Sequence, residues 1–497
     1  MENKTIKINY NLLEKYNLCH KCFGRLYGKS LQISNYERGK SLKLSRAIEL
    51  QLNLEYLKEE LNKLNSEELI SSENNEKITI IQNKINNIIN QLKILYNSGL
   101  TEINVEIFND LEYINKNTCN NNNNNNNKDN KDKTNIGIGE NKYSCPYCKD
   151  IFKEEHINDI VEKILKFTEN YEFETFLIGT KLPKVIKDFE KELIENNVDN
   201  LLFESIKNEV NRTIGKIISE KTGKKVNKEN PDIVIMINPY NKRIDLQINP
   251  IFIKGRYKKL IRGIPQSHWH CRSCRGKGCE KCNFTGKQYE TSVEEIIAKP
   301  FMEVFKGTDE AFHGAGREDI DVRMLGNGRP FVLQIKEPKI RKVDLKPLVE
   351  KVNSTGIVEI NSVEYGIRKD VIFFKNEAHK KTYLAHILCE EEVSKEEIIN
   401  IIDKMKNLKI NQRTPNRVSH RRADLIRERF VYNVQLDKII NSNEFTLKIY
   451  CDGGLYIKEL ISGDEGRTPN SVSDLLGKKC ICKYLDVLNV HDFEEHN

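Results

Sequence analysis

Residues 312–338, FHGAGREDIDVRMLGNGRPFVLQIKEP, carry the most information about this chain. Between Gly314 and Arg329 the segment packs four glycines, three acidic residues and three arginines into sixteen positions, directly before an apolar run that predicts a β-strand. Taken alone, this composition is typical of a charged loop between two elements. It also suits a site in which an aspartate stays ionised beside arginine, since a nearby positive charge lowers a carboxyl pKa. An ionised aspartate in a fixed position can act as a nucleophile or a base.

Strand-like segments continue on both sides of this loop. Downstream, GIVEINSVEYGIR, FTLKIYCDGGLYI and KYLDVLNVHDF alternate as strands do, and residues 395–406 have a helical pattern, which predicts a mainly antiparallel sheet with helices. Upstream, residues 155–250 mix helical and strand signals. They include the strands FETFLIGTKLP and PDIVIMINP and a strand pair in RIDLQINPIFIKGRY. We therefore predict that the fold class is α+β.

Eight of the thirteen cysteines form four CxxC pairs, which points to metal binding in a reducing compartment. Two pairs lie close together in CRSCRGKGCEKC, and four thiolates at this spacing suit tetrahedral zinc. The ligands would be Cys271, Cys274, Cys279 and Cys282.

The other two CxxC pairs are more than 120 residues apart. The stretch between them looks like an insertion, so its ends could meet and form a second four-cysteine zinc site from Cys19, Cys22, Cys145 and Cys148. Redox chemistry is the alternative, but neither pair follows the strand–helix pattern of thioredoxin-like motifs. Four protein ligands leave no open position, so both zinc ions would be structural. Buried or incidental thiols are expected at Cys119, Cys389, Cys451, Cys480 and Cys482.

The insertion has two parts. Residues 42–113 show apolar side chains at helical spacing among charged and amide residues, which predicts two or three amphipathic helices. Residues 114–140 include an unbroken Asn run and little apolar surface, so we predict that they are disordered.

Composition limits the class of protein. At roughly 150 residues per domain, 497 residues suggest about three domains. The net charge of +7 permits nucleic-acid binding without proving it. No apolar run reaches the ~18 residues that a membrane helix needs, and the N-terminus has no secretory h-region. We expect no membrane association and a cytoplasmic and/or nuclear location.

The glycine- and arginine-rich segment resembles the catalytic loop of pseudouridine synthases, whose shared core is Arg-x-Asp after a glycine. The longer GREDIDVRMLGNGRPF resembles the THUMP-containing tRNA pseudouridine synthases of archaea and eukaryotes, the Pus-ten family. Further blocks agree along about residues 1–40 and 141–497. They are CFGRLYG, NYERGKSL, FLIGTKLP, INPIFIKGRYKKLIRGIPQSHW, SVEEIIAKP, KTYLAHI, RTPNRVSHRRAD and GGLYIKELISGDEGRTPNSVSDLLG.

The resemblance assigns roles by motif position. Asp319 is the third residue of Arg-x-Asp and would be the catalytic aspartate, with Arg317 beside it and Asp321 as the competing candidate. Tyr383, in KTY, matches the active-site tyrosine that packs on the target base. Lys458, in GGLYIKE, matches the basic residue that pairs with the aspartate. The resemblance also implies an apolar floor for the active site.

That floor would come from SDLLG, at Leu475 or Leu476. RNA contact would come from two basic runs, GRYKKLIRG and RVSHRRADLIRER, because lysine and arginine bind phosphates and supply affinity and register. The residues predicted to contact RNA are Arg256, Lys258, Arg417, Arg421 and Arg422.

The resemblance also implies a domain plan. Residues 1–284 would form a THUMP-containing, zinc-binding RNA-recognition domain that includes the four-cysteine element at 266–287. Residues 285–497 would form a catalytic domain with the pseudouridine synthase fold. The implied reaction is isomerisation of uridine 54 and/or 55 in the tRNA T-loop, without an organic cofactor. We expect a monomer, because one chain would form the closed active site. An Asn-rich tract beside an archaeal-type cysteine cluster suggests a eukaryotic chain.

Three other functions remain open. A zinc-containing RNA-binding protein without catalysis, including one in small-RNA processing, would explain the cysteines and basic runs but not the GRED, KTY and YIKE motifs together. A THUMP-bearing methyltransferase would need a GxGxxG loop after a strand, which is missing. An interaction scaffold built on the helical insertion is the third alternative.

Overall fold

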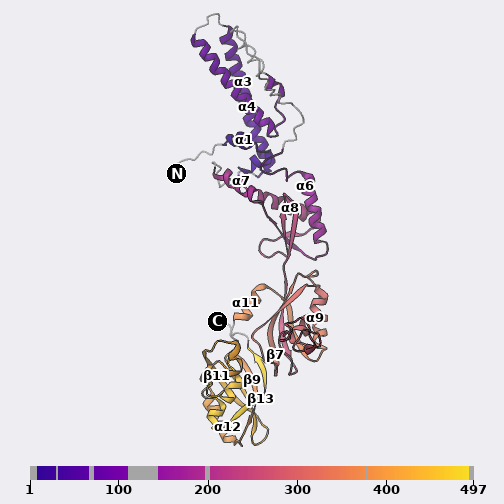
Figure 1. Ribbon diagram of the computed structural model, residues 1–497, viewed down its shortest axis with the longest axis vertical. Helices are drawn as coiled ribbons and strands as arrows, with labels where there is room; N and C mark the ends of the chain where they lie inside the picture. The colour runs from indigo at the N-terminus through magenta and orange to yellow at the C-terminus, as the bar shows by residue number, and fades with distance from the viewer. Residues whose placement is uncertain are drawn as a thin grey trace. The chain divides into compact units, whose positions relative to one another are not determined.

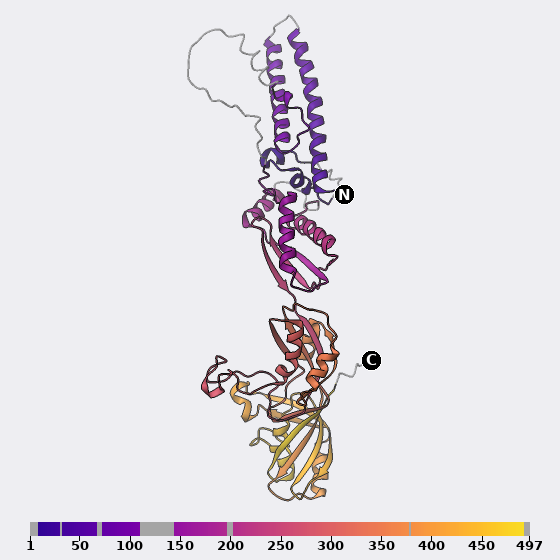
Figure 2. The same cartoon turned by 90° about the vertical axis from the view of Figure 1, so that its right-hand side faces the viewer.

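A computed structural model describes residues 8–29, 32–66, 72–109, 144–195, 202–376 and 379–491 (Figures 1 and 2). The chain divides into two compact units. Unit 1 comprises Met1–Glu169 and Glu174–Gln247, and unit 2 comprises Asn170–Phe173 and Ile248–Asn497. The division therefore falls before the cysteine element at 266–287, which belongs to unit 2, whereas the sequence placed the boundary after residue 284.

Unit 1 begins with helices. They are α1 (Asn11–Tyr16), α2 (His20–Arg25), α3 (Asn35–Ser66), α4 (Ser72–Asn97) and the 3-10 turn η1 (Val105–Asn109). Helices α3 and α4 lie side by side as an antiparallel pair (Figures 1 and 2). The predicted helical pattern is confirmed, but α3 begins at Asn35 rather than at residue 42. The predicted disorder at 114–140 falls on residues outside the described part of the chain.

Helices α2 and α3 cross with their backbones in direct contact. A methyl group on Gly39 would come within 1.9 Å of the His20 carbonyl oxygen, and one on Gly24 within 1.9 Å of the Asn35 oxygen. Only glycine fits at either position, because any Cβ would have to displace backbone. This crossing holds α2, which carries Cys22, against the long helix.

The second half of unit 1 is a small sheet with helices. Its sheet has the order β2-β1-β3-β4, and β1 pairs in parallel with both β2 and β3. Strand β3 alternates buried and partly buried residues, as a strand packed on one face does. The elements are α6 (Glu154–Thr168), β1 (Thr175–Thr180), α7 (Lys184–Glu195), α8 (Ile206–Thr222), β2 (Lys225–Val226), β3 (Ile233–Asn238) and β4 (Arg243–Ile248).

Unit 2 is built on one large sheet. In the described residues it has nine strands in the order β10-β11-β12-β9-β13-β7-β5-β8, with β6 also on β7. The strands are β5 (Ile251–Lys259), β6 (Asp309–Gly314), β7 (Val322–Lys336), β8 (Val358–Gly366), β9 (Lys381–Cys389), β10 (Leu408–Arg413), β11 (Ile426–Ile439), β12 (Glu444–Cys451) and β13 (Cys480–Val490). The predicted α+β class is confirmed. The two strands predicted in residues 243–257 are present as β4 and β5, but they do not pair with each other, because they belong to different sheets.

One parallel pairing decides where the functional loop lies. Within the described residues, the strand pairings of this sheet are antiparallel except that of β13 with β7, where Leu485–Val487 pair with Val322–Met324. These β7 residues directly follow the Arg-x-Asp segment, so the loop ends at the centre of the sheet. The helices and 3-10 turns of unit 2 are η3 (Glu280–Cys282), α9 (Val293–Phe305), α10 (Lys346–Asn353), α11 (Arg368–Asn376), α12 (Lys395–Met405), η4 (Asn416–Arg421), α13 (Ile457–Ser462) and α14 (Val472–Leu476).

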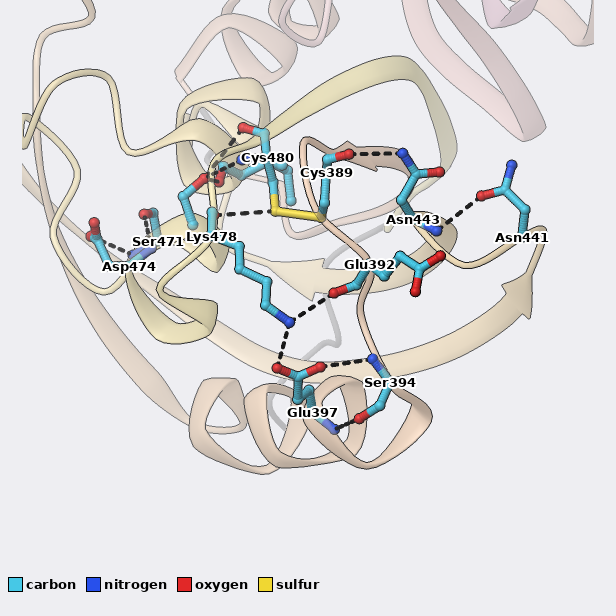
Figure 3. The surroundings of a disulfide bond; sticks show 12 residues. Cys389, Glu392, Ser394, Glu397, Asn441, Asn443, Ser471, Asp474, Lys478 and Cys480 are labelled. Atoms are coloured by element: carbon cyan, nitrogen blue, oxygen red, sulfur yellow. Dashed lines mark hydrogen bonds and ion pairs between the residues drawn. A yellow bond between two sulfur atoms is a disulfide. The ribbon is translucent and has the colours of Figure 1, made fainter.

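Two of the predicted thiols are joined. Cys389, at the end of β9, lies opposite Cys480, at the start of β13, and the two form a disulfide with Cα atoms 4.1 Å apart (Figure 3). Beside them, Lys478 Nζ donates to the Glu392 carbonyl and to Glu397 at 2.8 and 2.6 Å. The expectation of free thiols failed here because a sequence does not show which residues are cross-strand neighbours. Within the described residues, no helix has the length and apolar character to cross a membrane.

The glycine crossing of α2 and α3 can be tested with Gly39→Ala. We expect the variant to lower the local stability of these helices by about 1–3 kcal/mol, since the added methyl overpacks a backbone contact. Hydrogen exchange of the α2 and α3 amides would measure this local opening.

The matched control is Gly215→Ala in α8, where a methyl would meet only side chains at 3.8 Å. This change should leave unit 1 unaltered or stabilise it by about 0.4–1 kcal/mol, because alanine restricts the unfolded chain. Equal effects of the two substitutions would contradict the close-contact interpretation.

Candidate active site

A cleft of about 740 Å³ lies in unit 2 beside the loop that precedes β7. It brings together segments that are far apart in sequence, namely the 315–322 loop, the start of β9, residues 417–429 and the 453–458 turn. Of the predicted residues outside the cysteine groups, six line it: Arg317, Asp319, Tyr383, Arg417, Arg422 and Lys458.

The carboxylate of Asp319 faces two cations in this cleft. Arg417 Nη1 lies 2.8 Å from Asp319 Oδ2, and Lys458 Nζ lies 3.8 Å from the same oxygen. Arg417 is itself oriented from behind, because its Nε lies 2.6 Å from Oε1 of the nearly buried Glu459. Burial opposes the charge of Arg417, but Glu459 and then Asp319 outweigh it and raise the pKa of the guanidinium. The predicted basic partner, Lys458, is therefore present, but Arg417 is nearer.

Asp321, the competing aspartate, is placed differently. Its side chain is 64% exposed, against 33% for Asp319, and it does not line the cleft. Lys458 Nζ donates to Asp321 Oδ2 at 2.6 Å. Partial burial alone would raise the pKa of Asp321, but this hydrogen bond outweighs it and lowers the pKa. Lys458 thus bridges the two aspartates, and only Asp319 faces the cleft.

Tyr383 supplies the aromatic surface of the cleft. It lies on β9 and is 8% exposed. Burial raises the pKa of its phenol, so the group is neutral at physiological pH. The apolar part of the lining comes from Val322, Leu455, Ile457, Leu485 and Val487. Leu476, the predicted floor residue, instead lies in α14 and packs with Leu475 against the core.

A buried ion pair anchors the loop. Arg329 Nε donates to Glu318 Oε2 at 2.9 Å, and both side chains are essentially inaccessible. Arg329 Nη1 also donates to the Ala315 carbonyl, and the Tyr257 hydroxyl donates to Glu318. Gln266 links this cluster to the loop by donating to the Tyr257 oxygen and to the Gly316 carbonyl. The resemblance assigns no role to Glu318, although this residue lies between Arg317 and Asp319.

Lys259 holds the loop backbone from the other side. Its Nζ is buried and donates to the carbonyls of Ile264, Asp319 and Ile320 at 3.0–3.1 Å. Burial lowers the pKa of Lys259 to about 8. The basic run 255–263 had been predicted to contact RNA, but this lysine is committed to the active-site loop.

Arg256 and Lys258, the two residues of that run that were predicted to contact RNA, lie outside the cleft lining. Arg256 donates to the carbonyls of Asn327, Gly328 and Val490, and Lys258 pairs with Glu359 at 2.9 Å. Their contact with RNA remains a prediction. The side chain of Arg421 lies outside the described residues.

The cleft carries a strong positive charge. Its acidic lining residues are Glu318 and Asp319, and Glu318 is already neutralised by Arg329. The cationic lining residues are Arg317, Arg329, Lys381, Arg417, Arg422, Arg427, Arg429 and Lys458. Such a surface attracts a polyanion, since phosphate contacts dominate the affinity of proteins for nucleic acids.

The cysteines form two groups that could each hold a metal ion. The predicted pairing across the insertion is confirmed, because Cys19, Cys22, Cys145 and Cys148 place their sulfurs within 4.8 Å of one another. The second group is Cys271, Cys274, Cys279 and Cys282. Sγ–Sγ distances within the groups include 3.8 Å between Cys19 and Cys148 and 3.7–3.9 Å among the sulfurs of the second group. These match the roughly 3.8 Å expected between thiolates on a tetrahedral ion with bonds of about 2.3 Å.

The second cysteine group adjoins the active-site loop. Trp269, two residues before Cys271, lies under the Arg317 guanidinium at 6.0 Å from the ring centroid. Gln266, which binds the loop at Gly316, belongs to the same segment. The cysteine element therefore shares contacts with the loop that carries Asp319.

Comparison with known proteins gives consistent matches. The family described as "Pus10, C-terminal" matches residues 252–491, and "Pus10 THUMP domain, archaeal" matches residues 160–238. A tRNA pseudouridine synthase Pus10 of Methanococcus voltae is 48% identical over 97% of this chain and 98% of its own. The protein of the same name from Methanocaldococcus jannaschii is 49% identical over 98% of this chain and 94% of its own. These archaeal matches do not favour the eukaryotic source that the sequence suggested.

Solved structures give weaker matches. A Cbf5-Nop10-Gar1 complex aligns at 15% identity over 48% of this chain and 50% of that chain, with a TM-score of 0.27. A score this low supports no statement about the chain.

The loop anchor can be tested with Glu318→Gln. Loss of this carboxylate leaves Arg329 buried without a counter-charge, so we expect the free energy of unfolding of unit 2 to fall by about 3–5 kcal/mol. Urea denaturation followed by the fluorescence of Trp269, the sole tryptophan, would measure it.

Glu303→Gln is the matched control, since Glu303 pairs with Lys351 at 2.6 Å on the surface. That variant should show no measurable change, because exposed pairs contribute little. A similar loss in both variants would argue against the buried pair as the anchor.

Proposed function

We propose, from the premise that the chain belongs to the Pus10 family of tRNA pseudouridine synthases, that it isomerises uridine 54 and/or 55 in the tRNA T-loop. Enzymes of this class are isomerases that act on RNA. The membership favours the enzyme over the non-catalytic RNA-binding alternative. The T-loop position follows from the resemblance of the GRED, KTY and YIKE segments to the family.

One observation carries the chemical proposal: the Asp319 carboxylate faces the cleft between Arg417 and Lys458. Pseudouridylation breaks the N1–C1′ bond, turns the uracil and rejoins it through C5 without net redox change. A carboxylate at this point can attack C1′ or assist deprotonation of the ribose. The two cations hold the carboxylate at this point of the cleft, with Arg417 at 2.8 Å and Lys458 at 3.8 Å from the same oxygen.

The cleft also suits a nucleotide that has left its stack. A uridine within folded RNA must be flipped out before its glycosidic bond can be reached. The cleft volume of about 740 Å³ lies within the usual range for small-molecule sites. Tyr383 would stack on the detached uracil, as aromatic rings do with bases. Its neutral phenol adds no repulsion toward the uracil anion.

RNA affinity would come from the cations around the cleft. Within the described residues, the lining residue Arg422 makes no hydrogen bond or ion pair, and Arg427 and Arg429 also line the cleft. These residues would bind phosphates beside the target uridine. By resemblance, the THUMP domain in unit 1 would recognise the acceptor end of tRNA. A site formed by one chain favours a monomer.

We assign structural zinc to both cysteine groups. Four thiolates around a tetrahedral ion leave no position for substrate, so the ion would hold the fold and take no part in the reaction. In unit 1 the buried Arg25 supports this donor set, because its Nη2 donates to Cys22 Sγ at 3.0 Å. In unit 2 the ion would stabilise the segment from which Gln266 and Trp269 contact the active-site loop.

The catalytic assignment is tested by Asp319→Asn beside Asp321→Asn. We expect pseudouridine formation on an unmodified tRNA transcript to fall by on the order of 10⁴-fold or more in the first variant. Asp321→Asn should keep most of the activity, because Asp321 lies outside the cleft lining. Tritium release from 5-³H-uridine tRNA gives the rate, and base mapping gives the position.

Both variants should still bind tRNA, which filter binding would check. Activity that survives Asp319→Asn but not Asp321→Asn would transfer the catalytic role to Asp321. No pseudouridine from the folded wild type would refute the proposed reaction.

Metal analysis tests the zinc assignment. Elemental analysis of the purified chain should find about two zinc ions per molecule, because each ion takes four thiolates. Cys274→Ser should lose one ion and expose Trp269 to fluorescence quenchers, while Cys451→Ser, at a buried cysteine outside both groups, should lose none. Full zinc retention in Cys274→Ser would contradict the assignment in unit 2.

A further inference from the structure

Lys381 is a cleft residue that the proposed roles leave unused. It is the first residue of β9 and precedes Tyr383 by two positions. Side chains at this spacing on a strand point to the same face. Both residues line the cleft, so the Lys381 amine and the stacking ring of Tyr383 face the same substrate space.

Among the described residues, Lys381 has no anionic partner, unlike three other cations of the cleft. Arg329 is paired with Glu318, Arg417 with Asp319 and Lys458 with Asp321. Within the described part of the chain, the Lys381 amine makes neither a hydrogen bond nor an ion pair. A partly buried lysine without a carboxylate partner lacks the ion pair that would favour its charged form.

A second cation lies beside this amine. A methyl group on Gly316 would come within 3.1 Å of both Lys381 Nζ and Arg329 Nη1, so the two nitrogens flank the same small gap. The charged or titratable groups that act on Lys381 are Arg329, Glu318 and Cys451. Burial, and then the charge of Arg329, lower the pKa of Lys381 to about 7. A large share of the amine is therefore neutral near pH 7 and has a free electron pair.

The isomerisation needs such a base. Once C5 of uracil has bonded to C1′, C5 still carries its hydrogen and the ring contains an N1=C6 double bond. The C5 proton must leave so that the C5=C6 double bond can re-form. Asp319 is engaged at the ribose and by Arg417, and the neutral phenol of Tyr383 is a poor base at physiological pH.

We propose, on the basis of the proposed function, that Lys381 Nζ is the base that removes the C5 proton. The electrons of the C5–H bond form the C5=C6 bond, and the N1=C6 π pair moves to N1. N1 takes up a proton, and the Lys381 ammonium returns its own to N1 or to water. One proton is lost from carbon and one is gained by nitrogen, so no oxidant, reductant or further reactant is required.

The test compares Lys381→Met, Lys381→Arg and wild type on tRNA transcripts carrying 5-²H-uridine or ordinary uridine. Removing a general base typically costs about 10²–10⁴-fold in rate. We expect both variants to lose activity in this range, since arginine retains the charge but cannot accept a proton at neutral pH. We also expect the deuterium isotope effect on pseudouridine formation to be larger in Lys381→Met than in wild type, because proton removal becomes slower relative to the other steps.

Three further measurements distinguish a general base from a phosphate contact or a structural role of Lys381. The Kd for tRNA should change by less than about threefold in Lys381→Met, whereas a phosphate contact would weaken binding. Ethylamine should partly restore the activity of Lys381→Ala, which a merely structural role would not allow. His379 also lines the cleft, and His379→Gln should leave the isotope effect as in wild type.

Activity of Lys381→Arg near the wild-type rate would overturn the proposal and indicate a purely electrostatic role. An isotope effect that is unchanged in Lys381→Met, or that rises in His379→Gln instead, would also overturn it. In each case wild-type activity on the same transcript would leave the proposed function standing. Absence of pseudouridine from the wild type itself would instead refute that function.

Discussion

The buried pair of Glu318 and Arg329 is the interaction on which the active site depends. A loop with three acidic residues and several glycines has no intrinsic reason to adopt one conformation. The pair ties the loop to β7, while Tyr257 binds the same carboxylate from β5. Lys259 holds the backbone carbonyl of Asp319 itself. With its neighbours fixed in this way, the position of the Asp319 carboxylate is set before any substrate binds.

Charge is arranged in layers around this anchor. The deepest layer, Glu318 with Arg329, is closed to water and nearly neutral overall. The next layer pairs Asp319 with Arg417, which Glu459 orients from behind. Arg422, which also lines the cleft, makes no hydrogen bond or ion pair within the described part of the chain. This order places the Asp319 carboxylate, paired with Arg417, within a positively charged cleft lining that would attract phosphates.

The cysteine groups make a different kind of connection. In unit 1, two CxxC pairs far apart in sequence converge, and α2, which carries Cys22, packs on α3 through Gly24 and Gly39. In unit 2, a compact cysteine element supports Gln266 and Trp269 at the loop that carries Asp319. The first group therefore joins the two ends of a long insertion, whereas the second lies next to the loop that carries Asp319. A metal ion would stabilise the fold in both places, for different local reasons.

The sequence alone determined what depends on local pattern. The α+β class followed from periodicity and the CxxC pairs from spacing, whereas the choice of Asp319, Tyr383 and Lys458 followed from the resemblance to the pseudouridine synthases. Tertiary structure alone decided which partners these residues meet. In the folded chain Arg417 is the cation nearest to Asp319, and Leu476 lies outside the cleft lining. Cys389 and Cys480 form a disulfide. Each of these outcomes depends on strands and loops distant in sequence becoming neighbours. A side chain's burial and counter-charge come from those neighbours, and no local pattern specifies them.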